Sequence, residues 1–164
     1  TNVRERICNE LKNKLNTKII SRDEWHFRKE VYEKQITLNP KKESLRNKHF
    51  EKQYIDVLDK SIFSLCPSGT GCNTIRLWES ISYLSIPVIL SNTWHPPGDY
   101  RLWEDSCLII DENIEMINLH QVLNSFIKDK NKLYKKYKKL LELRNNFANE
   151  NIAKDLITIF FKKK

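Results

Sequence analysis

The stretch FSLCPSGTGCNTIRLWESISYLSIPVILSN, residues Phe63–Asn92, decides the fold. Each of its ends is a short apolar run rich in β-branched and aromatic residues, which predicts a buried strand. Between the strands lie a small-residue loop and a helical segment. The whole chain has three glycines, and two of them, Gly69 and Gly71, lie in this loop. Glycine is typical of places where a backbone turns sharply or approaches another group closely.

The same alternation of strands and helices extends outward in both directions. Continuous apolar strands separated by helices predict an α/β fold: a Rossmann-like parallel sheet with helices on both faces. Residues 22–44 are polar and predict a loop with some helix. The register of the helix after the loop predicts that Ile75, Trp78 and Ile81 face the sheet. We expect strands at 17–21, 61–67, 86–92 and 106–110, and helices at 2–16, 45–59, 73–82, 117–126, 131–146 and 152–161, with a helical turn in DYRLWED.

The charge of the chain is concentrated at its C-terminal end. Residues 1–127 contain 17 basic and 17 acidic side chains, whereas residues 128–164 contain 12 and 4, so the second segment carries the whole net charge of +8. We expect a Rossmann-like domain over 1–127 and basic helices over 128–164 that pack on it or trail from it. A neutral first segment argues against nucleic-acid binding. The basic amphipathic helix at 131–146 leaves two interpretations open, a helix docked on the domain and a peripheral contact with an anionic membrane.

The four cysteines, Cys8, Cys66, Cys72 and Cys107, include no Cys-x-x-Cys pair, and the chain has four histidines. This pattern does not predict a zinc site, and we expect no metal. Free thiols in a reducing compartment are the favoured interpretation, although Cys66 and Cys72 could meet across the loop. No run of 18 apolar residues is present. We therefore predict a cytoplasmic protein, with the membrane surface as an alternative location.

The loop and the start of the next helix offer groups that suit an anion. Free N–H groups at a helix N-terminus favour negative charge. Arg76 and Glu79 lie three residues apart on the helix, so they share part of one face. An arginine suits a phosphate and a carboxylate suits sugar hydroxyls. Two structural alternatives stay open, a turn that serves packing only and a surface ion pair. The neighbouring hydroxyl and amide side chains are Ser68, Thr70, Asn73 and Thr74.

An ordered string of motifs resembles the nucleotide-sugar half of exostosin-like glycosyltransferases. The string comprises Pro67 and Gly69, then Arg76, Trp78 and Glu79, then residues 86–89, Ser91-Asn92, Pro96-Pro97 and Trp103. The resemblance covers residues 54–110, about a third of the chain. It implies one half of a two-domain GT-B architecture whose donor site binds a nucleoside-diphosphate sugar, with UDP as the expected nucleotide.

The resemblance also implies roles for individual residues. The loop at Gly69 and Gly71 would hold the diphosphate, Arg76 would neutralise its charge, and Glu79 would hold the ribose or the sugar. Inverting transfer to a glycan or glycolipid acceptor would need no tightly bound metal and no cofactor. The donor-binding set expected from this resemblance is Ser68, Gly69, Thr70, Gly71, Asn73, Thr74, Arg76, Glu79, Ser91 and Asn92.

Two departures limit what the resemblance implies. Many relatives have a basic residue where this chain has Ser68, so one phosphate contact is missing. The acceptor-binding domain, which should supply the catalytic base, has no room in a chain that begins at Thr1, so we expect a fragment that binds donor better than it catalyses. A non-catalytic nucleotide- or partner-binding module is the alternative, and nucleic-acid binding through the lysine-rich end is a weaker one.

Two further residues lie in the loop that follows the second strand. Trp94 either stacks on a base or sugar or anchors the loop to the domain, and both interpretations stay open. His95 either contacts the donor or acts as a base, or is a solvent-exposed loop histidine. The sequence contains no legible catalytic triad or pair of catalytic carboxylates.

Overall fold

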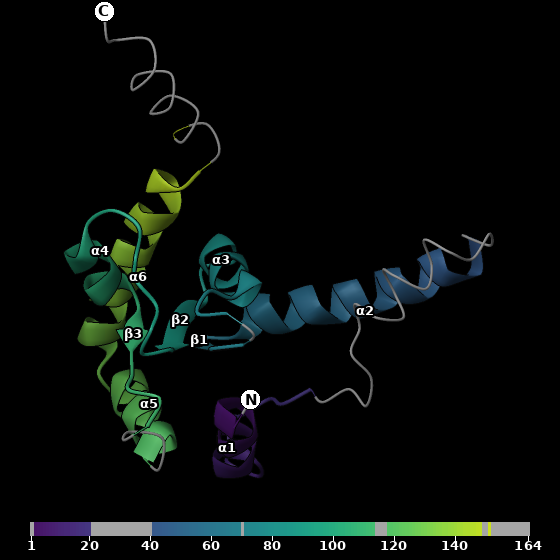
Figure 1. Cartoon of the computed structure of the whole chain (residues 1–164), viewed down its shortest axis with the longest axis horizontal. Helices are drawn as coiled ribbons and strands as arrows, with labels where there is room; N and C mark the ends of the chain where they lie inside the picture. Colours follow the sequence, from purple (N-terminus) through teal and green to yellow (C-terminus); the bar gives the residue numbers. More distant parts are fainter. Residues whose placement is uncertain (1, 21–40, 70, 114–117, 149–150, 152–164) are drawn as a thin grey trace, which may run out of the picture.

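The computed structural model describes residues 2–20, 41–69, 71–113, 118–148 and 151; for residue 2 and residues 41–50 only the backbone is described. Between residues 41 and 128, helices and strands alternate along the chain, as is typical of an α/β fold (Figure 1). In order, they are α1 (Asn2–Leu11), α2 (Lys41–Lys60), β1 (Phe63–Pro67), α3 (Ile75–Ser82), β2 (Ile86–Leu90), α4 (Tyr100–Ser106), β3 (Leu108–Ile109), α5 (Leu119–Lys128) and α6 (Lys130–Asn146).

The three described strands form one parallel sheet in the order β1-β2-β3. Leu65 pairs with Val88, which in turn pairs with Leu108. Every residue of the central strand β2 is buried. A strand that is apolar throughout needs cover on both faces, because side chains alternate between the faces of a sheet. The predicted Rossmann-like α/β fold is therefore confirmed.

Each face of the sheet carries its own apolar cluster. On one face, Leu77 of α3, Trp103 of α4 and Leu140 of α6 pack with Ile89 of β2. On the other face, residues of α1 and α5 pack against Val88 and other strand residues. Figure 1 shows α3 and α5 on opposite sides of the sheet and α2 extending away from it. The two clusters make the sheet the middle layer of three.

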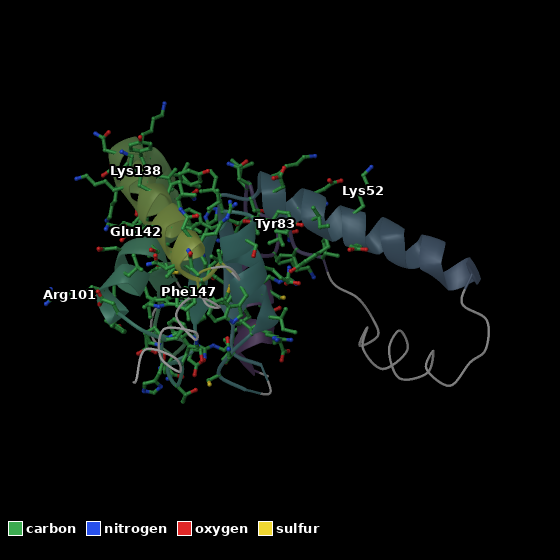
Figure 2. The ribbon with its side chains drawn as sticks, turned by 90° about the horizontal axis from the view of Figure 1, so that it is seen from above. Lys52, Tyr83, Arg101, Lys138, Glu142 and Phe147 are labelled. Carbon is green, nitrogen blue, oxygen red and sulfur yellow. The ribbon has the colours of Figure 1, made fainter. Side chains whose placement is uncertain are left out.

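Helix α6 is docked on the domain through its apolar stripe and one lysine. Leu140 and Leu143 are fully buried. The ammonium of Lys136 donates hydrogen bonds to the carbonyls of Glu104 (2.8 Å) and Cys107 (2.7 Å), at the C-terminal end of α4. A cation at that end of a helix is favourable. Lys138 and Glu142 lie on the opposite, outward side of α6 (Figure 2).

Several predicted details are wrong. Residues 17–20 form no strand and their isoleucines are exposed, and Ser21 lies outside the described residues. Helix α1 ends at Leu11 because Asn13 and Asn16 take left-handed backbone angles, φ 69° and 61°. In α3, Ile81 is buried and Trp78 packs against the core as predicted, whereas Ile75 is 66% exposed. The segments 22–40 and 152–161 fall wholly or largely outside the described residues.

All four cysteines are free thiols, with Cys66 and Cys107 buried and Cys8 and Cys72 exposed. The pairing of Cys66 with Cys72 is therefore not formed. Among the residues that the structure describes, no helix is both long enough and apolar enough to cross a membrane.

Candidate functional site

The carboxyl edge of the sheet, where β1, β2 and β3 all end, brings the predicted loops together. The N–H of Ser68 donates to the carbonyl of Leu90 (2.9 Å), and its hydroxyl donates to the Glu112 carboxylate (3.0 Å). The amide of Asn92 donates to Asp111 (2.9 Å), and its oxygen accepts the N–H of Glu112 (3.1 Å). Ser68 and Asn92 thus join the ends of all three strands, which fixes the entrance to the loop.

An arginine that the sequence interpretation overlooked lies against this loop. A Cβ atom placed on Gly69 would come within 2.9 Å of the Nη2 atom of Arg4, which extends from α1. The guanidinium therefore packs on the backbone of Gly69, and any larger residue at position 69 would displace it. Gly71, by contrast, has open space around its Cα. Among the glycines, the left-handed angle occurs at Gly98 (φ 77°).

The first turn of α3 begins where the loop ends. The side chain of Thr74 caps the helix by accepting the N–H of Arg76 (3.3 Å). The N–H of Gly69 donates to the carbonyl of Gly71 (3.1 Å). The amides of Ser68, Gly69 and Arg76 therefore already have acceptors within the chain. An anion would have to replace the acceptors of these three amides, and the side chains of Arg4 and Arg76 lie beside the loop as charged donors.

Arg76 and Glu79 are joined through a third residue rather than to each other. The Arg76 guanidinium lies over the ring of Tyr54 at 4.2 Å from the ring centroid, and the Tyr54 hydroxyl donates to Oε2 of Glu79. Among the described residues no ion pair within 4.0 Å links Arg76 to Glu79. The predicted pair of functional groups is thus held on one side of α3 by an aromatic side chain from α2.

Ser91 is the buried polar group of the site. Its side chain is 5% exposed, and its hydroxyl finds no hydrogen-bond partner among the described residues. Buried hydroxyls without partners are uncommon in folded proteins, because losing water without replacement costs about 1–3 kcal/mol. Ser91 follows directly on β2, so an unused donor lies at the carboxyl edge of the sheet.

The remaining predicted residues divide between structural and exposed positions. Trp94 packs edge-on against Trp103 with ring centroids 5.1 Å apart, which corresponds to the loop-anchoring interpretation. His95 is exposed, and its Nδ1 lies 3.1 Å from the carbonyl of Thr93. Asn73 is exposed, and Thr70 lies outside the described residues.

Arg4 and Tyr54 are the two residues that sequence reasoning missed. Arg4 is far from the loop in sequence, and only the packing of α1 on the sheet brings it there. Tyr54 lies within the helix that the sequence predicts over residues 45–59, but no role in the site was predicted for it. Its position next to a buried strand carries no signal that distinguishes a packing tyrosine from one that holds two charges.

A cavity of about 400 Å³ lies at the other, amino edge of the sheet. Its wall combines the end of α2, the starts of β1 and β2, and the first half of α6. It is lined chiefly by apolar and tyrosine side chains, with charged groups at its rim: Asp59, Lys60, Ser61, Ile62, Leu84, Ile86, Lys130, Leu133, Tyr134 and Tyr137. None of the predicted site residues contributes to it.

Burial affects the thiol beneath the loop. The buried position of Cys66, on β1, raises the pKa of its thiol to about 12. A neutral thiol is a weak nucleophile and a weak metal ligand. Among the described residues, no group of three or more His, Cys, Asp or Glu side chains is arranged to hold a metal ion.

Comparison with known proteins gives a consistent family. Residues 1–126 match the Exostosin GT47 domain. Exostosin-1 from Bos taurus is 29% identical over 86 residues, which is 51% of this chain and 11% of that protein. Exostosin-1c from Danio rerio is 34% identical over 70 residues (42% and 10%), and a probable glycosyltransferase from Arabidopsis thaliana is 26% identical over 102 residues (62% and 19%). No solved structure matches. The chain thus corresponds to less than a fifth of the length of each of these relatives.

Proposed function

The chain belongs to the Exostosin GT47 domain family, and on this premise we propose that it is the donor-binding part of a glycosyltransferase. The site would bind a nucleoside-diphosphate sugar, with UDP as the nucleotide. The observation that carries the proposal is the placement of two arginines, Arg4 from α1 and Arg76 from α3, beside one glycine-containing loop at the carboxyl edge of a parallel sheet. Ligands of open α/β sheets bind at this edge.

Each residue of the site has a chemical task in this proposal. The two guanidinium groups neutralise the diphosphate, because a planar fork of N–H donors matches phosphate oxygens. Arg4 supplies the positive charge that Ser68 does not. Glu79 accepts hydroxyl groups of the ribose or the sugar, and Ser91 lies beneath the edge with its hydroxyl buried. Thr74 sets the first turn of α3 and hence the position of Arg76.

In the transfer reaction these residues act on the leaving group. As the bond between the sugar and the diphosphate breaks, negative charge grows on the diphosphate. Guanidinium groups fixed beside it stabilise that charge without rearranging, which lowers the barrier. The acceptor is a glycan or glycolipid. The base that deprotonates the acceptor hydroxyl in inverting transfer would come from another domain, so this chain alone is expected to bind donor and to transfer little sugar.

The test is calorimetric titration of the purified chain with UDP, GDP and UMP, repeated for Arg76→Ala. We expect UDP to bind more tightly than UMP and the variant to lose about 10-fold to 100-fold in UDP affinity, since a hydrogen bond to a charged group contributes about 1.5–3 kcal/mol. Arg101→Ala is the matched control, because Arg101 is exposed and points away from the body of the molecule (Figure 2). Equal UDP affinity in all three proteins would contradict the proposal.

A further inference from the structure

Tyr54 reaches the candidate site from a helix that contributes no other contact to it among the side chains that the structure describes. It lies on α2, the helix that extends away from the sheet (Figure 1), and its side chain is half-buried. Its ring contacts the Arg76 guanidinium and its hydroxyl contacts the Glu79 carboxylate. One side chain therefore touches two of the three charged groups to which the proposed function gives a role, Arg76 and Glu79.

These two contacts change what Arg76 and Glu79 can do. Oppositely charged residues three apart on a helix are neighbours that ordinarily pair. Here the aromatic face takes the cation, an attraction of about 0.5–2 kcal/mol, and the phenol hydrogen-bonds the anion. The bond to Tyr54 uses Oε2 of Glu79, and Oε1 has no hydrogen-bond partner among the described residues. The guanidinium keeps its N–H groups at its edge, because the ring occupies its face.

The hydroxyl of Tyr54 stays a donor at neutral pH. Burial raises the pKa of the Tyr54 phenol, and the hydrogen bond to Glu79 raises it further. A protonated phenol can donate to a carboxylate, whereas a phenolate would repel it. The hydrogen bond that orients Glu79 therefore keeps its donor at neutral pH.

We propose that Tyr54 is a positioning residue of the donor site, which keeps Arg76 and Glu79 apart so that the first meets the diphosphate and the second meets a sugar hydroxyl. This inference rests on the proposed function. Its two halves are separable, because the ring acts on the arginine and the hydroxyl acts on the carboxylate. A side chain that served packing alone would have no such division.

The experiment compares Tyr54→Phe with Tyr54→Leu by titration with UDP and UDP-glucose, each measured also for Glu79→Gln and Arg76→Ala. Tyr54→Phe keeps the ring and removes the hydroxyl. We expect Tyr54→Phe to reproduce the pattern of Glu79→Gln. The affinity for whichever ligand Glu79→Gln binds more weakly should fall about 3-fold to 10-fold, and the affinity for the other ligand should fall less than 2-fold. Tyr54→Leu should weaken the binding of both ligands, because Arg76 also loses the aromatic ring that supports its guanidinium.

Tyr83→Phe is the matched control, since Tyr83 is an exposed tyrosine at the C-terminal end of α3 (Figure 2) and should leave both affinities unchanged. Thermal unfolding of each variant identifies loss of fold, and Tyr54→Phe keeps the test valid where Tyr54→Leu fails to fold. If Arg76→Ala loses UDP but Tyr54→Phe differs in pattern from Glu79→Gln, the inference is wrong and the proposed function stands. If wild type and Arg76→Ala bind UDP equally, or neither binds, both are wrong.

Discussion

The two edges of the sheet differ, and different features favour different edges as the ligand site. The amino edge holds the cavity of about 400 Å³, lined largely by apolar and tyrosine side chains. The carboxyl edge holds arginines from two helices, a buried serine whose hydroxyl has no hydrogen-bond partner among the described residues, and polar residues that join the strand ends. Concavity alone would select the amino edge, because ligand sites are generally concave. Topology and charge select the carboxyl edge, where ligands of open α/β sheets bind.

The largest expected effect is a loss of stability from a substitution in the core that supports both edges. Trp103 is fully buried, packs against Trp78, Trp94 and Phe147, and donates from Nε1 to the carbonyl of Pro97 (2.8 Å). Trp103→Ala should lower the free energy of unfolding by about 3–5 kcal/mol, as large core truncations do. Urea unfolding measures it, with the exposed Tyr100→Ala on the same helix as control. A loss below about 1 kcal/mol would show that this core does not support the edges.

The second prediction separates the edges by ligand affinity. Arg4→Ala should weaken UDP binding about 10-fold or more, because a charge-assisted contact to phosphate is lost. Lys130→Ala, at the rim of the amino-edge cavity, should change UDP affinity less than 2-fold. Both are measured by calorimetry on proteins with matched unfolding curves. The reverse result would move the donor site to the cavity.

The third prediction concerns how stability depends on pH through the buried thiol of Cys66, which lies on β1 near the carboxyl edge. The folded pKa of Cys66 is raised to about 12, against a reference value of 9.0. Between these values the unfolded chain releases the proton and the folded chain keeps it. The stabilising contribution is therefore complete below pH 9 and falls as pH rises, by about 1.4 kcal/mol per pH unit.

Chemical unfolding at pH 8, 9 and 10 measures this dependence. Between pH 9 and 10, the free energy of unfolding of Cys66→Ala should fall less steeply with pH than that of the wild type. The difference in slope is the contribution of the one proton that the Cys66 thiol carries. Part of the slope should persist in the variant, since burial also raises the pKa of Cys107. Identical slopes would mean that the Cys66 thiol titrates normally in the folded protein.

The smallest expected effects come from two helix caps, one near each edge. Thr74 caps α3 at the carboxyl edge, and Asp129 caps α6, which forms a wall of the cavity, by accepting the N–H of Lys132 (3.0 Å). Replacing either by alanine should cost about 1 kcal/mol of stability. Only Thr74→Ala should also weaken UDP binding, because it loosens the turn that carries Arg76. Equal effects on UDP would contradict the assignment of the site to one edge.

The sequence predicted the elements whose pattern is contained in one contiguous segment, and it failed where an element depends on its neighbours in the fold. The strand–loop–helix–strand unit at residues 63–92 was predictable because buried parallel strands are apolar throughout. The isoleucines at 19 and 20 misled, since two apolar residues satisfy a strand pattern without a neighbouring strand to pair with. On α3, Trp78 and Ile81 were assigned correctly to the inward face, and Ile75 was not, because it lies in the first turn, where an apolar residue can still face solvent.

The candidate site could be proposed from the sequence where its residues share one segment and not where packing assembles it. Arg76 and Glu79 follow the loop directly, and the ordered string of motifs around them, rather than their spacing alone, singled them out. Arg4 and Tyr54 are 65 and 15 residues from Gly69 in sequence. Only the packing of α1 and α2 on the domain brings them to the candidate site. The peripheral membrane contact through α6 stays a prediction, with Tyr134, Tyr137 and Leu141 exposed along the helix.

The most direct test of the donor site is an amide-resolved NMR titration of the ¹⁵N-labelled chain with UDP. We predict that the amides of Ser68, Gly69, Gly71 and Arg76 shift in a saturable way, while those of Ser61, Leu84 and Tyr134 at the cavity do not. This result would locate the nucleotide at the carboxyl edge without any mutation. Saturable shifts confined to the cavity residues, or no shifts in a folded chain, would contradict the account.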